Sequence, residues 1–555
     1  MALRLRNTYT KTVEEFQPLD PASKKVLFYS CGPTVYGFAH IGNFRTFLLA
    51  DVLRRTLEQK GFSVRHVMNV TDVGHMTEDH LADASGEDKL SKAAREIGWD
   101  PRQVAAHFER AFVEDAKALR LKNFSPEEAD RRELHPRATD YVAEMLAMIQ
   151  TLIERGYAYS DSIGQVYYEV SKFPDYGHLS GKVLDDLDLG ARIAVREEKR
   201  DPRDFALWKV DAKHLMKWDP HGPEGWQPGE YERLKALVPQ GMSPHIKAGF
   251  PGWHIECSAM SRARLGDAID LHTGGEDNIF PHHECEIAQS YGARTSDDGP
   301  PCFCRMWVHA RHLMVNGAKM SKRDGTLIAA RDLFDPRSRK REDLAAQLEA
   351  AGFAEARVPP SVLRFALIAT PFAQPMNFTI DVLVQANASL DRIQSLYGRL
   401  PAEGHAAEAS PEVREVVARA TERWDEALDD DLNMARALAE VFGVVSVANK
   451  RELTPEDGAA LRAFFDRCDE VLAVLDRAVR GGSFTHDELA AMPAGTELPA
   501  LVAPLAPADV PRVLAARLAA RREKNYARAD EIRRALLAAG IELEDVPAGV
   551  RWRYR

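Results

Sequence analysis

Four side chains that could together bind one zinc ion lie far apart in this chain. They are two thiols, an imidazole and a carboxylate, at Cys31, Cys257, His282 and Glu286. Zinc accepts all three donor types, and a site with an open position could take a further soft ligand such as a thiol. A metal site built from these residues would therefore suit a substrate that carries sulfur, and a thiol-bearing amino acid is the natural candidate.

The spacing of the two neighbouring histidines leaves the nitrogen ligand open. His282 lies four residues before Glu286 and His283 lies three before it, so either imidazole could share a helix face with the carboxylate. A competing metal cluster could form from three other thiols, Cys285, Cys302 and Cys304. If the segment CFC were a strand, it would put its two thiols on one side. Any one cysteine could instead be a small buried apolar residue.

Two further segments could bind a nucleoside triphosphate. The loop CGPTVYGFAHIGNFR precedes an expected helix, so His40, Gly42 and Asn43 lie where free N–H groups and the positive helix end would face phosphate. The segment VNGAKMSKRDGT holds Lys319 and Lys322, whose ammonium groups could stabilise charge that builds during attack on an α-phosphate. Alone, these segments could be a capped helix and a solvated loop. Together they favour an ATP site.

The surrounding elements indicate a βαβ unit. Residues 25–31 form an apolar run, and residues 63–69 alternate as a second strand. Between them, helical spacing is seen at Leu49, Val52, Leu53 and Leu57. The nucleotide loop would then lie at the carboxyl end of the first strand. We expect a helix over 141–155 and a hairpin around 163–168, both inside an insertion that interrupts the nucleotide-binding domain.

The last third of the chain indicates helices and a basic end. An apolar stripe at helical spacing is formed by Leu383, Leu390, Ile393, Tyr397 and Leu400. Residues 481–509 are rich in Gly, Pro and Ala, which predicts a linker. Residues 511–534 carry eight Arg or Lys against three acids, and the chain ends in RWRYR. This composition indicates an RNA surface, although a solvated helix face would look similar.

The composition is that of a multidomain protein without a secretion or membrane signal. The chain has 555 residues, 45% of them hydrophobic, and a net charge of -11. The start holds no long apolar run, and no run of about 18 apolar residues occurs. Six cysteines without regular spacing do not make a disulfide framework. We therefore expect a cytoplasmic protein with no membrane association, and we expect a monomer.

The nucleotide segments resemble the HIGH and KMSKS signatures of class I aminoacyl-tRNA synthetases, and the residues around them resemble cysteinyl-tRNA synthetases. The resemblance spans nearly the whole chain. Its segments are CGPTVYGFAHIGNFR, NVTDV, DFALWK, GFPGWHIECSAM, HTGGEDNIFPHHECEIAQS, KMSK, PMNFT, DDDLNMARAL and YARADEIRRALLAAGIELED. It implies an α/β fold with a Rossmann-type catalytic domain that contains an inserted domain, followed by an α-helical bundle and a small C-terminal anticodon-binding module.

The resemblance also implies a division of the chain. The Rossmann domain would occupy 1–130 and 244–316, around a connective insertion over 131–243. The implied later parts are the KMSK loop and stem-contact region over 317–375, a helical tRNA-binding bundle over 376–500 and a basic anticodon-binding domain over 501–555.

Site residues follow from the resemblance. One zinc ion per chain would be held by Cys31, Cys257, His282 and Glu286, with the two cysteines arriving from separate strand ends. Catalysis would use His40, Asn43, Lys319 and Lys322. ATP would also contact Gly42, Gly274, Gly275, Asp277, Met320 and Ser321. Cysteine would contact Cys31, Thr71, Trp253, His272 and Asp277.

The same resemblance gives the anticodon contacts as Arg521, Asp530 and Asp545, with Trp552 available to stack on a base. Asp530 could equally pair with Arg533 or Arg534 on its own helix. Three departures from the family pattern stand out. Arg323 and Asp324 follow KMSK, GHMTED follows TDV where many members have DDKI, and the loop between Trp208 and Gly249 is long.

The implied reaction is ATP-dependent activation of L-cysteine, with magnesium on the ATP, followed by transfer of the cysteinyl group to the terminal adenosine of tRNA(Cys). Pocket shape alone separates near-isosteres such as cysteine and serine only about a hundredfold, so zinc would select the thiolate. A cysteine ligase that acts on an amino sugar, as in mycothiol synthesis, is the alternative enzyme, but it would not need an anticodon module. A noncatalytic tRNA-binding paralogue would have no use for the lysines and ligands.

Overall fold

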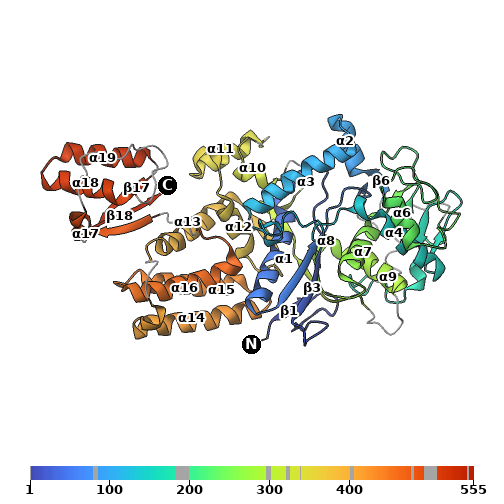
Figure 1. Cartoon of the computed structure of the whole chain (residues 1–555), viewed down its shortest axis with the longest axis horizontal. Coiled ribbons are helices and arrows are strands. Elements are labelled where there is room, and N and C mark those ends of the chain that lie inside the picture. The colour runs from blue at the N-terminus through green and yellow to red at the C-terminus, as the bar shows by residue number, and fades with distance from the viewer. Residues whose placement is uncertain are drawn as a thin grey trace. The chain divides into compact units, whose positions relative to one another are not determined.

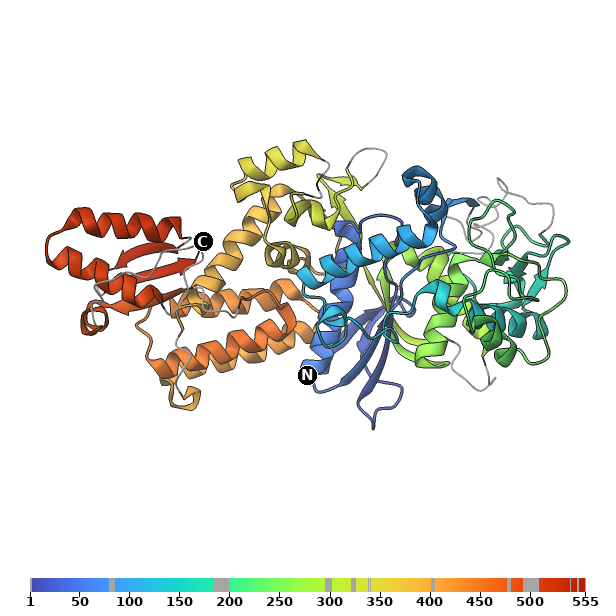
Figure 2. The ribbon, with the colours of Figure 1, turned by 45° about the horizontal axis from the view of Figure 1, so that its top comes forward.

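A four-stranded parallel sheet, in the order β12-β11-β3-β4, forms the centre of the expected nucleotide-binding domain. The ribbon is shown in Figures 1 and 2. Its strands are β3 (Lys25–Ser30), β4 (Ser63–Met68), β11 (Ile269–Gly275) and β12 (Cys304–Ala310). All three pairings between neighbouring strands are parallel. Parallel strands end at the same edge of a sheet, so the loops after β3 and β11 meet there. The expected α/β fold is confirmed.

The computed structural model describes residues 2–78, 85–182, 199–294, 302–320, 326–337, 339, 341–400, 405–476, 481–492, 509–539, 541–546 and 549–554. The chain forms two compact units. The first unit comprises Met1–Leu383 and Glu426–Ala435, and the second comprises Val384–Asp425 and Arg436–Arg555.

Helix α1 (Ile41–Gln59) connects β3 to β4, as expected. The apolar residues that predicted it, Leu49, Val52, Leu53 and Leu57, are at most 1% exposed. His40 caps the helix: its Nδ1 accepts a hydrogen bond from the Asn43 N–H at 3.1 Å, and Asn43 Oδ1 accepts one from the His40 N–H at 3.1 Å. This reciprocal cap fixes the conformation of residues 40–43, which we call the HIGN turn, at the start of the helix.

Two buried arginines connect α1 to helix α12 (Pro360–Ala369). Arg45 of α1 donates hydrogen bonds at 2.9 to 3.0 Å to the carbonyl groups of Leu367, Pro371 and Gln374. Arg364 of α12 donates to Asp51 Oδ2 of α1 at 2.6 Å. Moving α1 away from α12 would remove partners of two buried charges, which is strongly destabilising. These contacts therefore hold α1 in a defined position.

We expect Asp51→Asn to lower the free energy of unfolding by about 3 kcal/mol at pH 7, because it leaves Arg364 buried without its anion. Burial would raise the pKa of Asp51, but Arg55, Arg364 and the Lys122 N–H together hold it at about 2. The unfolded pKa is about 3.9, so the carboxylate stabilises the fold above about pH 4, and this stabilisation is lost as the pH falls toward 2. Denaturant unfolding at pH 7 and pH 3 measures both effects.

The difference between wild type and Asp51→Asn should shrink at the lower pH. The exposed Asp130 offers a matched control in the same unit, and Asp130→Asn should change stability by less than about 0.5 kcal/mol. Equal losses in the two variants would contradict the role given to the buried pair.

A second, antiparallel sheet forms much of the expected insertion. Its order is β10-β9-β8-β7, with β7 (Ala158–Ser160), β8 (Val166–Tyr168), β9 (Phe205–Lys209) and β10 (Phe250–Pro251). The expected hairpin and helix are confirmed as β7 with β8 and as α4 (Val142–Glu154). One hydrophobic core includes Val166 and Trp208 of this sheet and Tyr29 and Ile269 of the parallel sheet. The insertion therefore shares its core with the nucleotide-binding halves.

The long segment between Trp208 and Gly249 has a structural role. It carries helix α6 (Glu230–Leu237) and places Trp218 and Ile246 in the shared core. The backbones of Trp218 and Gly249 exchange hydrogen bonds at 2.8 and 3.1 Å. The Trp208 indole donates to the Lys247 carbonyl at 2.9 Å. These contacts hold the two ends of the segment together beside β9.

The remaining strands of the first unit form three small sheets, β1-β2, β5-β6 and β14-β13-β15. Their bounds are β1 (Arg4–Asn7), β2 (Thr12–Glu15), β5 (Met76–Glu78), β6 (Ser85–Asp88), β13 (Leu313–Val315), β14 (Ala318–Lys319) and β15 (Met376–Phe378). The further helices are α2 (Lys89–Ile97), α3 (Pro101–Ala118), α7 (Trp253–Leu265), α8 (Glu276–Asn278), α9 (Glu284–Ala293), α10 (Ala330–Phe334) and α11 (Glu342–Ala350).

Helices dominate the region that the apolar stripe predicted. They are α13 (Ile380–Tyr397), α14 (Pro411–Asp429), α15 (Met434–Ala448) and α16 (Pro455–Leu472). All five stripe residues are at most 6% exposed, which confirms the stripe as a core face. None of the helices in the described ranges combines the length with the apolar character that a bilayer crossing requires.

The C-terminal module is a three-stranded antiparallel sheet with helices and its own apolar core. Its elements are β16 (Gly481–Thr485), α17 (His486–Ala491), α18 (Val510–Arg522), α19 (Tyr526–Ala538), β17 (Ile541–Val546) and β18 (Gly549–Tyr554). The linker expected over 481–509 is wrong for its first part, because β16 pairs with β18 along its whole length. Residues 493–508 lie outside the described ranges.

Candidate metal centre and nucleotide site

The structure brings the four predicted zinc ligands together in the interior of the first unit. Cys31 follows β3, Cys257 lies on α7, His282 lies in a π-helical turn (Ile279–His283), and Glu286 lies on α9. Cys31 is 9% exposed and the other three at most 1%. The expectation that both cysteines arrive from strand ends is wrong for Cys257. Its helix packs against β3, and this packing directs the thiol toward the strand end.

Two of the four distances between donor atoms match those around a zinc ion, and the other two are slightly longer. Cys31 Sγ lies 4.0 Å from Cys257 Sγ and 4.0 Å from Glu286 Oε1. His282 Nε2 lies 3.3 Å from Cys257 Sγ and 3.2 Å from Glu286 Oε1. Tetrahedral zinc with bonds of about 2.0 to 2.3 Å separates its donors by about 3.2 to 3.8 Å. The donor types and their spacing are both compatible with a metal site.

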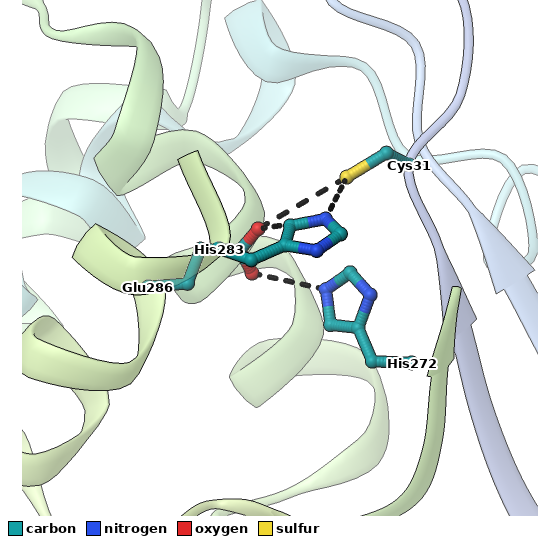
Figure 3. Close-up of side chains that lie close together, drawn as sticks. All are labelled: Cys31, His272, His283 and Glu286. Carbon is teal, nitrogen blue, oxygen red and sulfur yellow. Dashed lines mark hydrogen bonds and ion pairs between the residues drawn. The ribbon is translucent and has the colours of Figure 1, made fainter. Parts of the chain in front are cut away.

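A second donor set shares two of these residues. Cys31, His272, His283 and Glu286 point toward one another in Figure 3, and the donor atoms of each set all lie within 4.8 Å of one another. Cys31 Sγ lies 3.2 Å from His283 Nε2, and His272 Nε2 lies 3.1 Å from Glu286 Oε2. The geometry, like the spacing in the sequence, leaves the choice between His282 and His283 open.

His283 is oriented by residues that sequence reasoning missed. Its Nδ1 lies 2.7 Å from His309 Nε2, and His309 Nδ1 lies 2.7 Å from Thr8 Oγ1. When one ring nitrogen binds a metal, a hydrogen bond to the other ring nitrogen holds the imidazole in one orientation. His309 is placed by the parallel pairing of β12 with β11, and Thr8 is held beside β12 because its N–H donates to the Trp307 carbonyl at 2.8 Å. No local spacing signals this contact.

Burial opposes charge at every donor. It raises the pKa of Cys31, Cys257 and Glu286 and lowers the pKa of His282. These shifts belong to groups packed without a cation. A divalent ion bound there would reverse the shifts of the two thiols and the carboxyl group, since it favours thiolate and carboxylate, and it would favour the same neutral imidazole that burial favours.

The competing thiol cluster does not form. Cys285 Sγ lies 3.3 Å from the Tyr176 hydroxyl, and Cys302 Sγ accepts a hydrogen bond from the Trp307 indole at 3.2 Å. Within the described ranges, neither convergent donor group includes Cys285, Cys302 or Cys304. These thiols are small buried residues of the core.

The HIGN turn is joined to the end of the KMSK segment. The Ile41 N–H donates to the Ile328 carbonyl at 3.0 Å, and the Ala330 N–H donates to the Ala39 carbonyl at 3.0 Å. A Cβ added to Gly42 would lie 2.6 Å from Met320 Cε, so glycine permits this close approach. Lys319 ends β14 and is exposed. Ser321, Lys322, Arg323 and Asp324 lie outside the described residues.

His40 is prepared to donate a hydrogen bond. Because its Nδ1 accepts the Asn43 N–H, the proton of the neutral ring lies on Nε2. Burial lowers the pKa of His40 to about 4, against a smaller raising effect of Asp277. The ring is therefore neutral at pH 7, with an N–H available at the start of α1.

The other predicted pocket residues surround the carboxyl edge of the sheet. Thr71 is 3% exposed and accepts a hydrogen bond from Asn69 Nδ2 at 3.0 Å. Trp253 begins α7 and stacks on His282, with ring centroids 4.3 Å apart. His272 lies on β11, is fully buried and stacks on Trp307 at 4.5 Å.

The GGED segment, residues 274–277, spans the end of β11 and the start of α8. A Cβ on Gly274 would lie 2.5 Å from His283 Cε1, so this glycine makes room for the imidazole. Gly275 is the last residue of β11. Asp277 is 69% exposed, and its Oδ1 lies 3.4 Å from His312 Nδ1.

The predicted anticodon residues all lie in the C-terminal module. Asp545 accepts two hydrogen bonds from Arg517 at 2.7 Å and lies 3.3 Å from Arg521. Asp530 is exposed, and Arg534 donates to its backbone carbonyl at 3.4 Å. The expectation that Trp552 could stack on a base is wrong, because it is 5% exposed and lies in the module's core. Among the aromatic side chains of the module whose exposure the structure describes, Tyr526 is exposed, at 61%.

Comparisons with known proteins agree with these features. The profile described as "tRNA synthetases class I (C) catalytic domain" matches residues 16–231 and 232–347. The profile of the DALR domain matches residues 423–476, and that of the "Cysteinyl-tRNA ligase anticodon binding domain" matches residues 503–553.

Two of the relatives match this chain along at least 98% of their length. The cysteine–tRNA ligase of Salinibacter ruber is 39% identical, over 100% of this chain and 98% of the relative. The cysteine–tRNA ligase of Koribacter versatilis is 36% identical, over 100% of both chains. A LeuRS from Agrobacterium radiobacter K84, solved with tRNA and LeuAMS, has a TM-score of 0.52 and 12% identity over 82% of this chain and 85% of that one, which shows the fold alone. The chain belongs to the cysteine–tRNA ligase family of class I aminoacyl-tRNA synthetases.

Proposed function

We propose that this chain activates L-cysteine with ATP and transfers it to tRNA(Cys). The observation that carries the proposal is the convergence of two thiols, imidazoles and a carboxylate next to the β3–α1 loop that ends in the capped HIGN turn. A thiol-binding centre and a phosphate-binding helix start are thereby neighbours. We further propose that the protein acts as a cytoplasmic monomer, with the domain bounds given above except that the C-terminal module begins with β16.

The first step joins cysteine to the nucleotide. One carboxylate oxygen of cysteine attacks the α-phosphorus of magnesium-ATP, and the bond from that phosphorus to pyrophosphate breaks. The His40 Nε2–H and the free N–H groups at the start of α1 would donate to phosphate oxygens. The ammonium groups of Lys319 and Lys322 would stabilise the charge that builds on the phosphates. Gly42, Asn43, Gly275 and Asp277 would line the nucleotide site together with Met320 and Ser321.

The second step releases AMP. A hydroxyl group of the terminal adenosine of the tRNA attacks the carbonyl carbon of the adenylate, and AMP leaves with the electron pair of the broken bond. We propose that Arg521, Asp530 and Asp545 contact the anticodon. Asp545 is held by Arg517 and Arg521, so its carboxylate is oriented before RNA binds.

Selection of the amino acid would occur at the buried donors. We propose that Cys31, Cys257, His282 and Glu286 hold one zinc ion, and that Thr71, Trp253, His272 and Asp277 contact cysteine. Zinc held there would accept a thiolate and disfavour a hydroxyl, which is the chemistry that separates cysteine from serine.

Pyrophosphate exchange and charging assays test the function. Wild-type protein should exchange pyrophosphate with ATP in the presence of cysteine and should charge tRNA(Cys). With serine, we expect exchange that is weaker by more than the factor of about a hundred that shape alone provides. Transfer of cysteine to an amino sugar in place of tRNA would support the alternative ligase. Absence of cysteine-dependent exchange would favour a noncatalytic tRNA-binding protein.

The two donor sets predict opposite results for neighbouring histidines. If the first set holds the ion, we expect His282→Ala to lose it and His283→Ala to retain about one zinc per chain. Each variant is the matched control of the other, since both side chains are at most 1% exposed. The metal content of each variant after dialysis against a chelator distinguishes the two donor sets. The reverse pattern would assign the ion to Cys31, His272, His283 and Glu286.

A further inference from the structure

His75, in the GHMTED segment that departs from the family pattern, stacks on the tryptophan of the proposed cysteine site. The His75 and Trp253 rings lie 4.2 Å apart between centroids, with an interplanar angle of 11°. His282 stacks on the same indole at 4.3 Å and 20°. Two imidazoles side by side on one face could not both approach the indole centre this closely without clashing. Trp253 therefore lies between His75 and His282.

Both ring nitrogens of His75 have partners. Lys89 Nζ lies 3.0 Å from Nε2, and Thr34 Oγ1 lies 2.8 Å from Nδ1. An ammonium group only donates, so Nε2 accepts and the ring proton lies on Nδ1, which donates to Thr34. The Lys89 N–H also donates to the His75 carbonyl at 2.8 Å. These contacts fix the position of the imidazole and its rotation within the ring plane.

These contacts join three separate parts of the first unit. Thr34 belongs to the β3–α1 loop, Lys89 begins α2, and Trp253 begins α7. His75 and Trp253 are both partly exposed, as expected for the lining of a site that a ligand enters. Without the His75 ring, one face of the indole would lose its packing partner, and the indole could turn away from His282.

We propose that His75 is a positioning residue that holds the Trp253 indole against His282 and so fixes the pocket for a small thiol-bearing amino acid. The inference rests on the proposed function, in which Trp253 contacts cysteine. It assigns a role to a segment that the family pattern leaves unexplained. His75 would act through Trp253 and not on the reacting atoms.

A kinetic split tests the proposal. We expect His75→Ala to raise the KM for cysteine in pyrophosphate exchange about tenfold, because an aromatic pair contributes up to about that factor. The KM for ATP, kcat and zinc content should change less than about twofold, since the ring partners described for His75, which are Trp253, Thr34 and Lys89, are not among the proposed nucleotide residues. His75→Phe keeps a ring on the indole, so it should restore the cysteine KM to within about threefold of wild type.

His107 provides a matched control. His107 lies on α3, and its ring contacts Trp99 edge to face at 5.4 Å, Phe108 at 5.0 Å and Phe38 at 6.2 Å, none of which is a proposed residue of the cysteine pocket. His107→Ala should leave the cysteine KM unchanged. A wild-type cysteine KM in His75→Ala would overturn the proposal. So would equal losses for ATP and cysteine, or a failure of His75→Phe to improve on His75→Ala.

A spectroscopic measurement separates this inference from the proposed function. In protein labelled with 5-fluorotryptophan, Trp253→Phe identifies the fluorine resonance of residue 253. His75→Ala should shift that resonance, and His107→Ala should leave it unchanged while shifting the resonance of Trp99. An unshifted Trp253 signal in His75→Ala contradicts the stacking role even if cysteine is activated. Absence of cysteine activation in wild type contradicts the proposed function, and the fluorine result still decides the role of His75.

Discussion

His40→Ala should lower the rate of cysteine-dependent pyrophosphate exchange about a hundredfold to a thousandfold, which is the usual cost of removing one well-placed donor to developing charge. The donor is the Nε2–H, because Nδ1 already accepts the Asn43 N–H. The loss should appear mainly in kcat, since the phosphate charge grows in the transition state. Exchange at the wild-type rate would contradict the assignment.

Helix capping could confuse this result, because alanine also removes the N-cap at a cost of about 1 kcal/mol. His40→Asn separates the two effects, since asparagine caps helices well but its shorter side chain does not extend to the position of Nε2. We expect His40→Asn to unfold like wild type and to remain slow in exchange. Full recovery of the rate in His40→Asn would mean that capping, not donation to phosphate, is the role of His40.

The pH dependence provides a further check on His40. Burial lowers its pKa to about 4, so the ring stays neutral above pH 6. The ratio of the wild-type rate to the His40→Ala rate should therefore be constant from pH 6 to pH 8. A ratio that changes steeply over this range would show that the ring titrates there.

Cys31→Ala should abolish metal binding and cysteine activation together. Cys31 belongs to both donor sets, so neither set is complete without it. We expect less than about one-tenth of a zinc per chain after dialysis, and cysteine-dependent exchange at least about a thousandfold slower, because substrate selection and orientation both depend on the ion. Metal analysis and exchange measured on the same preparation check the two effects.

Cys304→Ala is the matched control for this prediction. Cys304 is a thiol of β12 that is 1% exposed and belongs to neither donor set. It should retain about one zinc per chain and exchange near the wild-type rate. Retention of zinc by Cys31→Ala, or its loss from Cys304→Ala, would contradict the assignment of the metal centre. Neither variant should activate serine better than the wild-type protein does.

Much of the fold could be predicted from local patterns. The apolar run before Cys31, the helical spacing of Leu49 and Leu53, and the alternation after Gly61 specify a strand, a helix and a strand, and the structure contains all three. The chemical types of the predicted ligands were also visible, because zinc limits the choice to a few side chains. The donors gather as expected, while their role as ligands stays a prediction.

Other features depend on pairing between distant segments, which local periodicity does not encode. Residues 481–485 looked like a linker, yet they form an edge strand because β18 supplies their hydrogen-bond partners. Trp552 looked available for stacking on a base, yet the helices of its own module cover it. The burial of a side chain depends on which elements pack over it, and one segment of sequence does not contain that information.

The sequence by itself determined the family, the βαβ unit and the side chains able to hold a metal and a triphosphate. Only the tertiary structure brought Cys31 to within 4.0 Å of Cys257, which lies 226 positions later, and placed His75 and His282 against Trp253. The physical reason is that composition and spacing set the chemistry and local conformation of each segment. Distances between segments are set by the packing of the shared core, which every element contributes to at once.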